Sequence, residues 1–191
     1  MFSGIIQAKV RVEKASERGK NLVVRIRAPR GWRIRPGDSI SVDGVCSTAA
    51  KVSKNFIEFD YMPETLALTT VSGFIQGTEV NLERSMKYGD RVDGHFVAGH
   101  VDARGEVVSV RNGVLTVRIP QALSRLVAIK GSIAVNGVAL TVTARTTKSF
   151  SVALIPYTLA HTNLGKLKEG HVVNVEVDLL ARYLDALMKK R

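Results

Sequence analysis

Short apolar segments alternate with Gly, Asn and Asp along much of the chain, a pattern typical of antiparallel β-structure. The clearest case is residues 105–110 and 114–119, two Val-rich segments joined by Arg111-Asn112-Gly113. Asn-Gly readily adopts the positive φ angles of a two-residue hairpin turn. We therefore predict a β-hairpin here, with a looser counterpart in the first half formed by residues 8–13 and 22–26.

Each half of the chain offers four further strands at matching positions. We predict strands at residues 39–43, 45–52, 56–61 and 79–84, and again at 132–136, 138–145, 149–155 and 172–177. Six short strands per half with no long helix between them favour a closed antiparallel barrel over a parallel sheet. The predicted fold class is all-β, with two tandem six-stranded antiparallel barrels and a C-terminal α-helix.

The second half of the chain repeats the first at an offset of 93 residues. Residues 39–45 read SISVDGV and residues 132–138 read SIAVNGV, and the later motif Gly-x-x-Val-Asn-x-Glu occurs at 77–83 and 170–176. A period of this length is too long for a solenoid repeat and suits a compact domain. We predict domains at 1–93 and 94–178, a C-terminal helix at 179–191, and two similar binding sites.

The C-terminal helix belongs to neither repeat. Its apolar stripe at helical spacing consists of Leu179, Leu180, Tyr183, Leu184, Leu187 and Met188. Such a stripe either packs on its own barrel or joins copies of the chain, and the sequence leaves both open. Two shorter helical turns are expected at 63–66 and 156–159, each opened by a Pro at the first position.

Composition narrows the class of protein. Apolar residues make up 45% of the 191, but no apolar run is long enough to span a bilayer and no secretory leader is evident. We expect a soluble cytoplasmic protein without a membrane segment. One cysteine and four scattered histidines argue against a disulfide framework and a metal site. The net charge of +11 is dispersed along the chain, which argues against a nucleic-acid partner.

Two reactive residues differ from their counterparts in the other repeat. Cys46 aligns with Ala139, and His100 aligns with Ile5 at a local offset of 95. The structural interpretation of Cys46 is a small buried residue in a strand. His95 and His100 would lie on opposite faces of a strand, which argues against shared metal ligation. The glycines around His100 would allow a ligand to approach the backbone closely.

Several segments together resemble one known family over essentially the whole chain, in order and at the family's spacing. They are residues 1–6 (MFSGII), 44–46 (GVC), 62–66 (MPETL), 80–84 (VNLER), 94–102 (GHFVAGHVD), 130–133 (KGSI), 140–142 (LTV), 155–159 (IPYTL) and 173–178 (VNVEVD). With these motifs the chain resembles the riboflavin synthase family.

The resemblance implies two Greek-key barrels, a C-terminal helix that joins three chains into a homotrimer, and a reaction that needs no cofactor. In that reaction one 6,7-dimethyl-8-ribityllumazine gives a four-carbon unit to another, which yields riboflavin and 5-amino-6-ribitylamino-pyrimidinedione. The working site would pair the first barrel of one chain with the second barrel of its neighbour. Association with lumazine synthase is a further expectation.

Carried over by position, the resemblance places a pocket in each barrel. The first-barrel pocket would comprise Gly4, Ile5, Ile6, Cys46, Ser47, Thr48, Asp60, Tyr61, Met62, Pro63, Glu64, Thr65, Gly99, His100 and Val101. The second-barrel pocket would comprise Lys130, Ala139, Leu140, Thr141, Ala153, Leu154, Ile155, Pro156, Tyr157 and Thr158. His100 and Cys46 are the candidates for proton transfer and for nucleophilic addition or ring orientation, and the sequence does not choose between these roles.

The second repeat departs from the family pattern at two positions. Asn136 and Ala139 stand where the family has Asp and Ser, which removes a carboxylate and a hydroxyl. If those groups act on the substrate, the second pocket is weakened, and the alternative is a non-catalytic lumazine- or flavin-binding protein of the same fold. Residues 94–100 keep the family's Gly-His-Phe-Val-x-Gly-His segment, which favours the enzyme.

Overall fold

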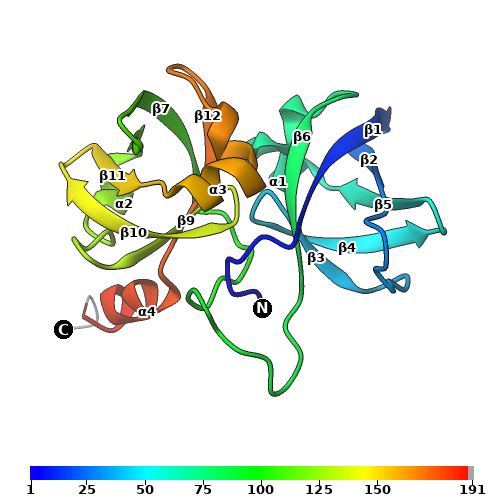
Figure 1. Ribbon diagram of the computed structural model, residues 1–191, viewed down its shortest axis with the longest axis horizontal. Helices are drawn as coiled ribbons and strands as arrows, with labels where there is room; N and C mark the ends of the chain where they lie inside the picture. The colour runs from blue at the N-terminus through cyan, green and yellow to red at the C-terminus, as the bar shows by residue number, and fades with distance from the viewer. Residues whose placement is uncertain (189–191) are drawn as a thin grey trace.

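The computed structural model describes residues 1–188, so residues 189–191 of the predicted C-terminal helix lie outside the described part. Two closed β-barrels stand side by side, with the N-terminal segment passing between them (Figure 1). The first barrel consists of β1 (Ala8–Arg18), β2 (Asn21–Arg27), β3 (Ser39–Val42), β4 (Val45–Val52), β5 (Phe56–Tyr61) and β6 (Glu79–Arg84). The second consists of β7 (Ala103–Arg111), β8 (Val114–Arg118), β9 (Ser132–Val135), β10 (Val138–Arg145), β11 (Ser149–Ala153) and β12 (Val172–Val177).

Both barrels have the same antiparallel topology. The first closes in the order β1-β2-β5-β4-β3-β6, and the second closes in the order β10-β11-β8-β7-β12-β9, which is the same circle with each strand replaced by its repeat. The return of β5 to lie between β2 and β4 is the non-sequential connection of a Greek key. The predicted fold class of two duplicated six-stranded barrels is confirmed.

The hairpin predicted around Arg111-Asn112-Gly113 is confirmed as β7 and β8. Arg111 pairs with Val114, and the two turn residues Asn112 and Gly113 have φ angles of 51° and 73°. Both angles are positive, as a type I′ turn requires, and Asn-Gly meets this requirement at low steric cost.

Short helices follow β5 and β11 at the positions that the two prolines predicted. They are α1 (Pro63–Leu68) with the 3₁₀ turn η1 (Thr70–Gly73), and α3 (Pro156–His161) with η2 (Asn163–Lys166). Thr69 and Thr162 join each pair, because each hydroxyl donates to a carbonyl four residues back and accepts from an amide two residues on. A further short helix, α2 (Gln121–Ser124), was not predicted, and α4 (Leu179–Met188) forms the C-terminal helix.

Each barrel has its own apolar core, as the alternating pattern of its strands requires. Val24, Ile26 and Phe59 are fully or almost fully buried in the first, and Val117 and Phe150 are fully buried in the second. A third small cluster joins the barrels and consists of Phe2, Val97 and Ala134, with Cys46 packed against it. The N-terminal segment is therefore part of the connection between the barrels.

The barrels meet where the β3–β4 turn abuts the β9–β10 turn. Asp43 and Gly44 have φ angles of 47° and 81°, and Asn136 and Gly137 have 45° and 77°, so both turns are of the type I′ kind. A Cβ atom on Gly44 would lie 2.7 Å from the backbone nitrogen of Gly137. Only glycine allows the two turns to approach this closely.

Buried asparagines bind the two turns together crosswise. The Asn81 side chain, from the first barrel, donates to the Asn136 carbonyl at 3.0 Å, and the Asn174 side chain donates to the Asp43 carbonyl at 2.8 Å. Asn163 completes the network, because its amide nitrogen donates to Asp43 and its amide oxygen accepts from Asn81 and Asn136. Asp43 and Asn81 of the first repeat are thereby hydrogen-bonded to Asn136, Asn163 and Asn174 of the second.

Asp43 carries the only acidic group in this network. Its carboxyl oxygen accepts from the Asn81 backbone amide at 2.7 Å, as the Asn136 side chain accepts from Asn174 at 2.8 Å in the other repeat. Burial raises the pKa of the Asp43 carboxyl to about 7, although the hydrogen bonds from Asn81 and Asn163 oppose this. One repeat therefore holds a carboxyl where the other holds a neutral amide.

We predict that Asp43→Asn flattens the pH dependence of stability. Between the unfolded pKa of 3.8 and the folded value of about 7, the folded wild type binds more protons than the unfolded chain, so its stability falls as pH rises. The fall attributable to Asp43 is up to about 4 kcal/mol over this range, at about 1.4 kcal/mol per pKa unit. Urea unfolding from pH 4.5 to 8 measures it.

The matched control is Asn136→Asp, which adds a second buried carboxyl at the repeat-related position and should steepen the fall. If Asp43→Asn leaves the slope of the wild type unchanged, the buried carboxyl does not have the raised pKa assigned to it.

Candidate functional site

The first candidate site is a crevice beside the start of β4 in the first barrel. Its volume is about 250 Å³, and it is lined by Val45, Cys46, Glu64, Thr65, Leu68, Thr69, Gly99, His100 and Val101. Strand β4, helix α1 and the segment that precedes β7 each supply part of this lining. The structure thus brings Cys46, His100 and Glu64 to one crevice, from positions far apart in the sequence.

Close backbone contact fixes Gly99 to Cys46 in this crevice. The Cys46 amide donates to the Gly99 carbonyl at 2.8 Å, and a Cβ atom on Gly99 would lie 2.7 Å from the Cys46 Cβ. Gly99 also has a φ angle of 79°, which side chains rarely tolerate. His100 follows directly and is exposed, while Cys46 is partly buried, so both reactive groups lie at the accessible edge of the barrel.

The second barrel has an equivalent contact between Gly4 and Ala139. The Ala139 amide donates to the Gly4 carbonyl at 2.8 Å, and a Cβ atom on Gly4 would lie 2.5 Å from the Ala139 Cβ. Helix α3 stands where α1 stands in the first barrel, and on it Tyr157 stacks over His161 at 4.0 Å between ring centroids. Ala139 and Tyr157 occupy the places of Cys46 and Glu64, so this site has a different set of chemical groups.

The structure places Gly4 and Ile6 against the second barrel, and residues 4–6 do not line the first-barrel crevice to which they were predicted to belong. Gly4 contacts Ala139 of the second barrel, and Ile6 packs against the core of that barrel. Conversely Val101, which comes after the first repeat, packs against the core of the first barrel. The segments around Gly4 and Gly99 therefore cross each other between the barrels, and each contacts the barrel of the other repeat.

The departure at Asn136 lies away from both sites. Its side chain accepts from the Asn174 amide in the contact between the barrels, so it has a structural partner, and it does not line the first-barrel crevice. The expectation that a missing carboxylate at this position weakens the second pocket therefore finds no geometric support. Ala139, in contrast, lies against Gly4, so the absence of a serine hydroxyl at this position changes the chemical groups of the second site.

Some predicted site residues point their side chains elsewhere. The Ser47 hydroxyl is hydrogen-bonded to the Tyr61 hydroxyl at 2.8 Å inside the first barrel, where burial raises the pKa of the phenol. Asp60 is held by Arg18 and Asn21 on the adjoining hairpin. Lys130 lies at the opposite end of the β9–β10 hairpin from Ala139, and Leu154 is in the core.

The other predicted residues lie on β4 and β10, or from the end of β5 into α1 and from the end of β11 into α3. Thr48 and Thr141 are exposed on β4 and β10, and Leu140 is partly buried. Those at the ends of β5 and β11 and the starts of α1 and α3 are Met62, Pro63, Thr65, Ala153, Ile155, Pro156 and Thr158. Of these, Met62 and Ile155 leave more than half of their surface exposed, at 64% and 60%. They offer apolar surface beside the two sites.

Two buried glutamates were missed as functional candidates, although the repeat contained them both. Glu83 on β6 accepts from the Ser3 amide at 2.7 Å and from the Gly4 amide at 3.0 Å. Glu176 on β12 accepts from the Ala98 amide at 2.8 Å and the Gly99 amide at 3.0 Å. Burial raises the pKa of both carboxyls, and the amide hydrogen bonds oppose this rise. The sequence did contain a signal for them, because the repeat has Glu at both matching positions, 83 and 176.

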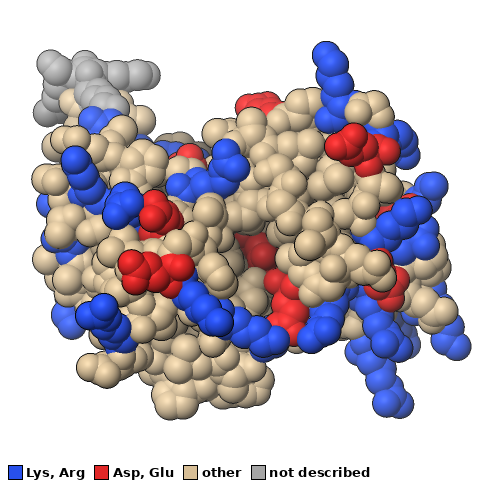
Figure 2. Space-filling view, turned by 90° about the horizontal axis from the view of Figure 1, so that it is seen from above, with Lys and Arg blue, Asp and Glu red and all other residues tan. Residues whose placement is uncertain are grey.

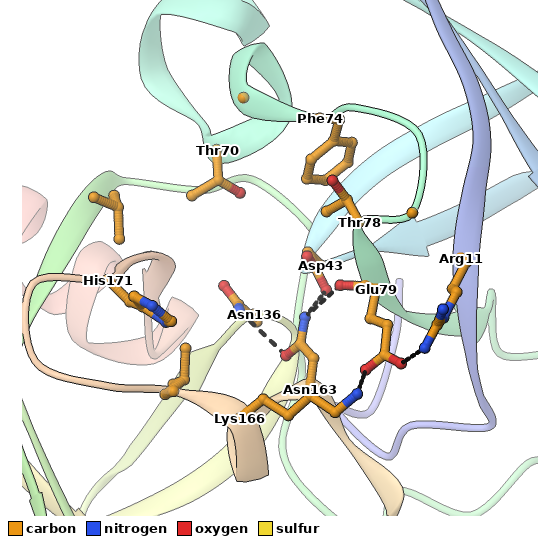
Figure 3. Close-up of a pocket in the computed structure, with 14 residues that line it drawn as sticks. Arg11, Asp43, Thr70, Phe74, Thr78, Glu79, Asn136, Asn163, Lys166 and His171 are labelled. Carbon is orange, nitrogen blue, oxygen red and sulfur yellow. Dashed lines mark hydrogen bonds and ion pairs between the residues drawn. The ribbon is translucent and has the colours of Figure 1, made fainter.

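A larger cleft of about 550 Å³ lies between the barrels (Figure 3). Asn136 and Asp43 lie at its centre, His171 and Thr70 face it, and at one side Lys166 pairs with Glu79 at 2.7 Å. Seen from above, the molecule is hollowed between its two halves, with acidic side chains in the hollow and Lys and Arg around it (Figure 2). None of the predicted site residues lines this cleft.

Comparison with known proteins places this geometry in a family. The lumazine binding domain matches the chain twice, over residues 3–85 and 98–178. The chain therefore belongs to the lumazine-binding domain family, and the two matches correspond to the two barrels.

Within that family, riboflavin synthases are similar to this chain over its full length. The protein of Chlamydia trachomatis serovar D is 38% identical over 190 residues, covering 99% of this chain and 96% of the relative. That of Bacillus subtilis strain 168 is 34% identical over 195 residues, covering 100% of this chain and 91% of the relative. The chain belongs to the riboflavin synthase family.

The fold also matches that of solved structures. LumP in complex with riboflavin has a TM-score of 0.84 and 24% identity, with 93% of this chain and 99% of that chain covered. LumP in complex with 6,7-dimethyl-8-(1'-D-ribityl) lumazine has a TM-score of 0.81 at the same identity and coverage. The likeness establishes the architecture of two barrels in one chain.

Within residues 1–188, no helix has both the length and the apolar character that crossing a membrane requires. The same part of the chain contains no cluster of three or more His, Cys, Asp or Glu side chains arranged to hold a metal ion.

We predict that Gly99→Ala destabilises the protein by roughly 2–4 kcal/mol, because it combines a strained backbone with a collision against Cys46 and disturbs the hydrogen bond there. Gly19→Ala is the matched control: Gly19 also has a positive φ, 62°, but open space around it, so this change should cost only about 1 kcal/mol. Thermal or urea unfolding compares them. Equal losses would show that the close approach to Cys46 contributes nothing.

Proposed function

We propose that this chain is a riboflavin synthase that converts two molecules of 6,7-dimethyl-8-ribityllumazine into riboflavin and 5-amino-6-ribitylamino-pyrimidinedione. The observation that carries the proposal is the duplicated contact, Gly99 on Cys46 and Gly4 on Ala139, at equivalent edges of two similar barrels. Two copies of one binding domain suit a reaction between two copies of one molecule. The full-length similarity to riboflavin synthases supports the same reaction.

The two sites differ in their reactive groups, which supports different roles for the two bound molecules. The first crevice has Cys46, Glu64 and His100, whereas the residues related to them by the repeat are Ala139, Tyr157 and Ile5. Proton transfer from the acidic lumazine 7-methyl group requires a base, and His100 is the histidine placed in the first crevice. Cys46 lies beside it and either adds to the ring or orients it.

The non-catalytic alternative is not favoured. Riboflavin synthases are 34% to 40% identical to this chain over nearly its full length, whereas LumP is 24% identical. The chain also keeps the residues of the 94–100 segment, which places His100 beside Cys46.

We further propose that α4 joins three chains, so that the first barrel of one chain faces the second barrel of its neighbour. Leu180, Tyr183, Leu184 and Leu187 on this helix are 60–67% exposed in the single chain, which is a large apolar surface for a helix. Arg182 ties α4 to the first site, because it pairs with Asp102 at 2.9 Å and donates to the His100 carbonyl at 3.4 Å. A cytoplasmic location and an association with lumazine synthase stay predictions.

The activity is tested by incubating the purified protein with 6,7-dimethyl-8-ribityllumazine alone and following riboflavin by its visible absorbance. Riboflavin should form, and His100→Ala should lower the turnover number by about 10²-fold because a general base is lost. His171→Ala is the control: His171 faces the cleft between the barrels, so its removal should leave turnover unchanged. Tight binding of the lumazine without riboflavin would contradict the proposal.

Oligomer formation is tested with Leu184→Lys combined with Leu187→Lys, which places two charges on the exposed face of α4. The mass in solution, measured by analytical ultracentrifugation, should fall from that of a trimer to that of a monomer. Ile75→Lys is the control, since Ile75 is an apolar residue with 69% exposure in the loop before β6. A double variant that stays trimeric would show that α4 does not hold the chains together.

A further inference from the structure

The segments that complete the two sites are held by glutamates of the opposite barrels. Glu83 stands on β6 of the first barrel, yet the segment it holds, residues 3–5, reaches Ala139 of the second. Glu176 stands on β12 of the second barrel, yet the segment it holds, residues 98–100, reaches Cys46 of the first. The last strand of each barrel thus holds part of the other barrel's site.

Each glutamate makes several short hydrogen bonds in a buried setting. Glu83 is 1% exposed and accepts from the Ser3 amide, the Ser3 hydroxyl and the Gly4 amide at 2.7, 2.7 and 3.0 Å. Glu176 is 3% exposed and accepts from the Ala98 and Gly99 amides at 2.8 and 3.0 Å. Hydrogen bonds to a carboxylate are stronger than neutral ones, so these groups hold the segments firmly.

The two segments are also paired with each other. Phe2 and Val97 exchange backbone hydrogen bonds of 2.8 and 3.0 Å, and the His95 amide donates to the Ser3 carbonyl at 3.1 Å. In Figure 1 the N-terminal segment passes between the barrels. The glutamate therefore adds to two other attachments of each segment, the pairing at the crossing and the backbone hydrogen bond to Cys46 or Ala139, and its loss should loosen the segment at the opposite site.

We propose that Glu83 and Glu176 are positioning residues that act crosswise, Glu83 on the second-barrel site and Glu176 on the first-barrel site. The carboxylate of Glu176 aligns the amides of residues 98 and 99, so that the Gly99 carbonyl meets the Cys46 amide and His100 enters the crevice. The carboxylate of Glu83 does the same for residues 3 and 4, so that the Gly4 carbonyl meets the Ala139 amide. That these edges are substrate sites rests on the proposed function, but the crosswise positioning does not.

The lone thiol of the chain makes the proposal measurable without any substrate. Cys46 lies under Gly99, so the rate of its alkylation by iodoacetamide reports how well residues 98–100 cover the first site. A second reporter carries Cys46→Ala with Ala139→Cys, which places the thiol under Gly4 in the second site. Both reporters are full-length chains, and each is combined in turn with Glu83→Gln and with Glu176→Gln.

Glutamine cannot accept from two amides with both of its terminal atoms, because one of them is a donor. Glu176→Gln should therefore raise the alkylation rate of Cys46 about tenfold and leave the second reporter within twofold, and Glu83→Gln should do the reverse. Glu17→Gln, an exposed site on β1, should change neither rate. The proposal is overturned if each variant exposes the thiol of its own barrel, if neither rate changes, or if both thiols become equally reactive through general unfolding.

A milder variant keeps the test decisive if a buried glutamine prevents folding. Ser3→Ala removes only the hydroxyl bond to Glu83 at 2.7 Å. It should raise the alkylation rate of the second reporter by several-fold and leave that of Cys46 unchanged. An unchanged second reporter would contradict the role of Glu83. Because no lumazine is present, a failure of the riboflavin assay would leave this result standing.

Discussion

The close packing of two glycine turns is the constraint on which the arrangement of the barrels depends. Gly44 and Gly137 approach so closely that a single added methyl group on either would meet the backbone of the other. Around this contact the side chains of Asn81 and Asn174 donate to carbonyls of the opposite turn. The hydrogen bonds are directional, so they set the orientation of one barrel on the other, whereas apolar packing alone would allow sliding.

The same contact explains why the two repeats differ at Asp43 and Asn136. Each accepts from the backbone amide of an asparagine on its own barrel, and Asn163 hydrogen-bonds to both. If both positions held a buried carboxyl, the ionisation of one would raise the free energy of ionising the other. One carboxyl and one amide give the same geometry without that repulsion. Both residues fill the same hydrogen-bonding place in the interface, so the difference between the repeats requires no role in the reaction.

The crossing of residues 2–5 and 95–100 links this interface to the sites. Phe2 and Val97 pair in the small apolar cluster between the barrels, and the glycines that follow them reach the two site edges. The crossing adds the His100 imidazole to the Cys46 thiol and the Glu64 carboxylate in the first site, whereas the residues related to these three by the repeat are Ile5, Ala139 and Tyr157. A duplicated scaffold with unequal lining residues is suited to holding the same molecule in two roles.

The amino-acid sequence was enough to predict the strands, the duplication, the Asn-Gly hairpin and the short helices opened by Pro63 and Pro156. These features depend on the periodicity of apolar residues and on local backbone preference, and residues close together in the sequence determine both. It also singled out Cys46 and His100, because they interrupt the match between the repeats.

Which barrel each crossing segment completes became clear only from the three-dimensional packing of the two barrels. Gly4 contacts Ala139, and Glu83 accepts from Ser3. These residues are so far apart in the sequence that no local sequence pattern indicates the contacts. The repeat showed Glu83 and Glu176 to be alike, but a buried carboxylate that holds backbone amides looks, in sequence, like any other glutamate at a strand end. Such contacts arise from the placement of one barrel on the other, which the packing of Gly44 on Gly137 sets.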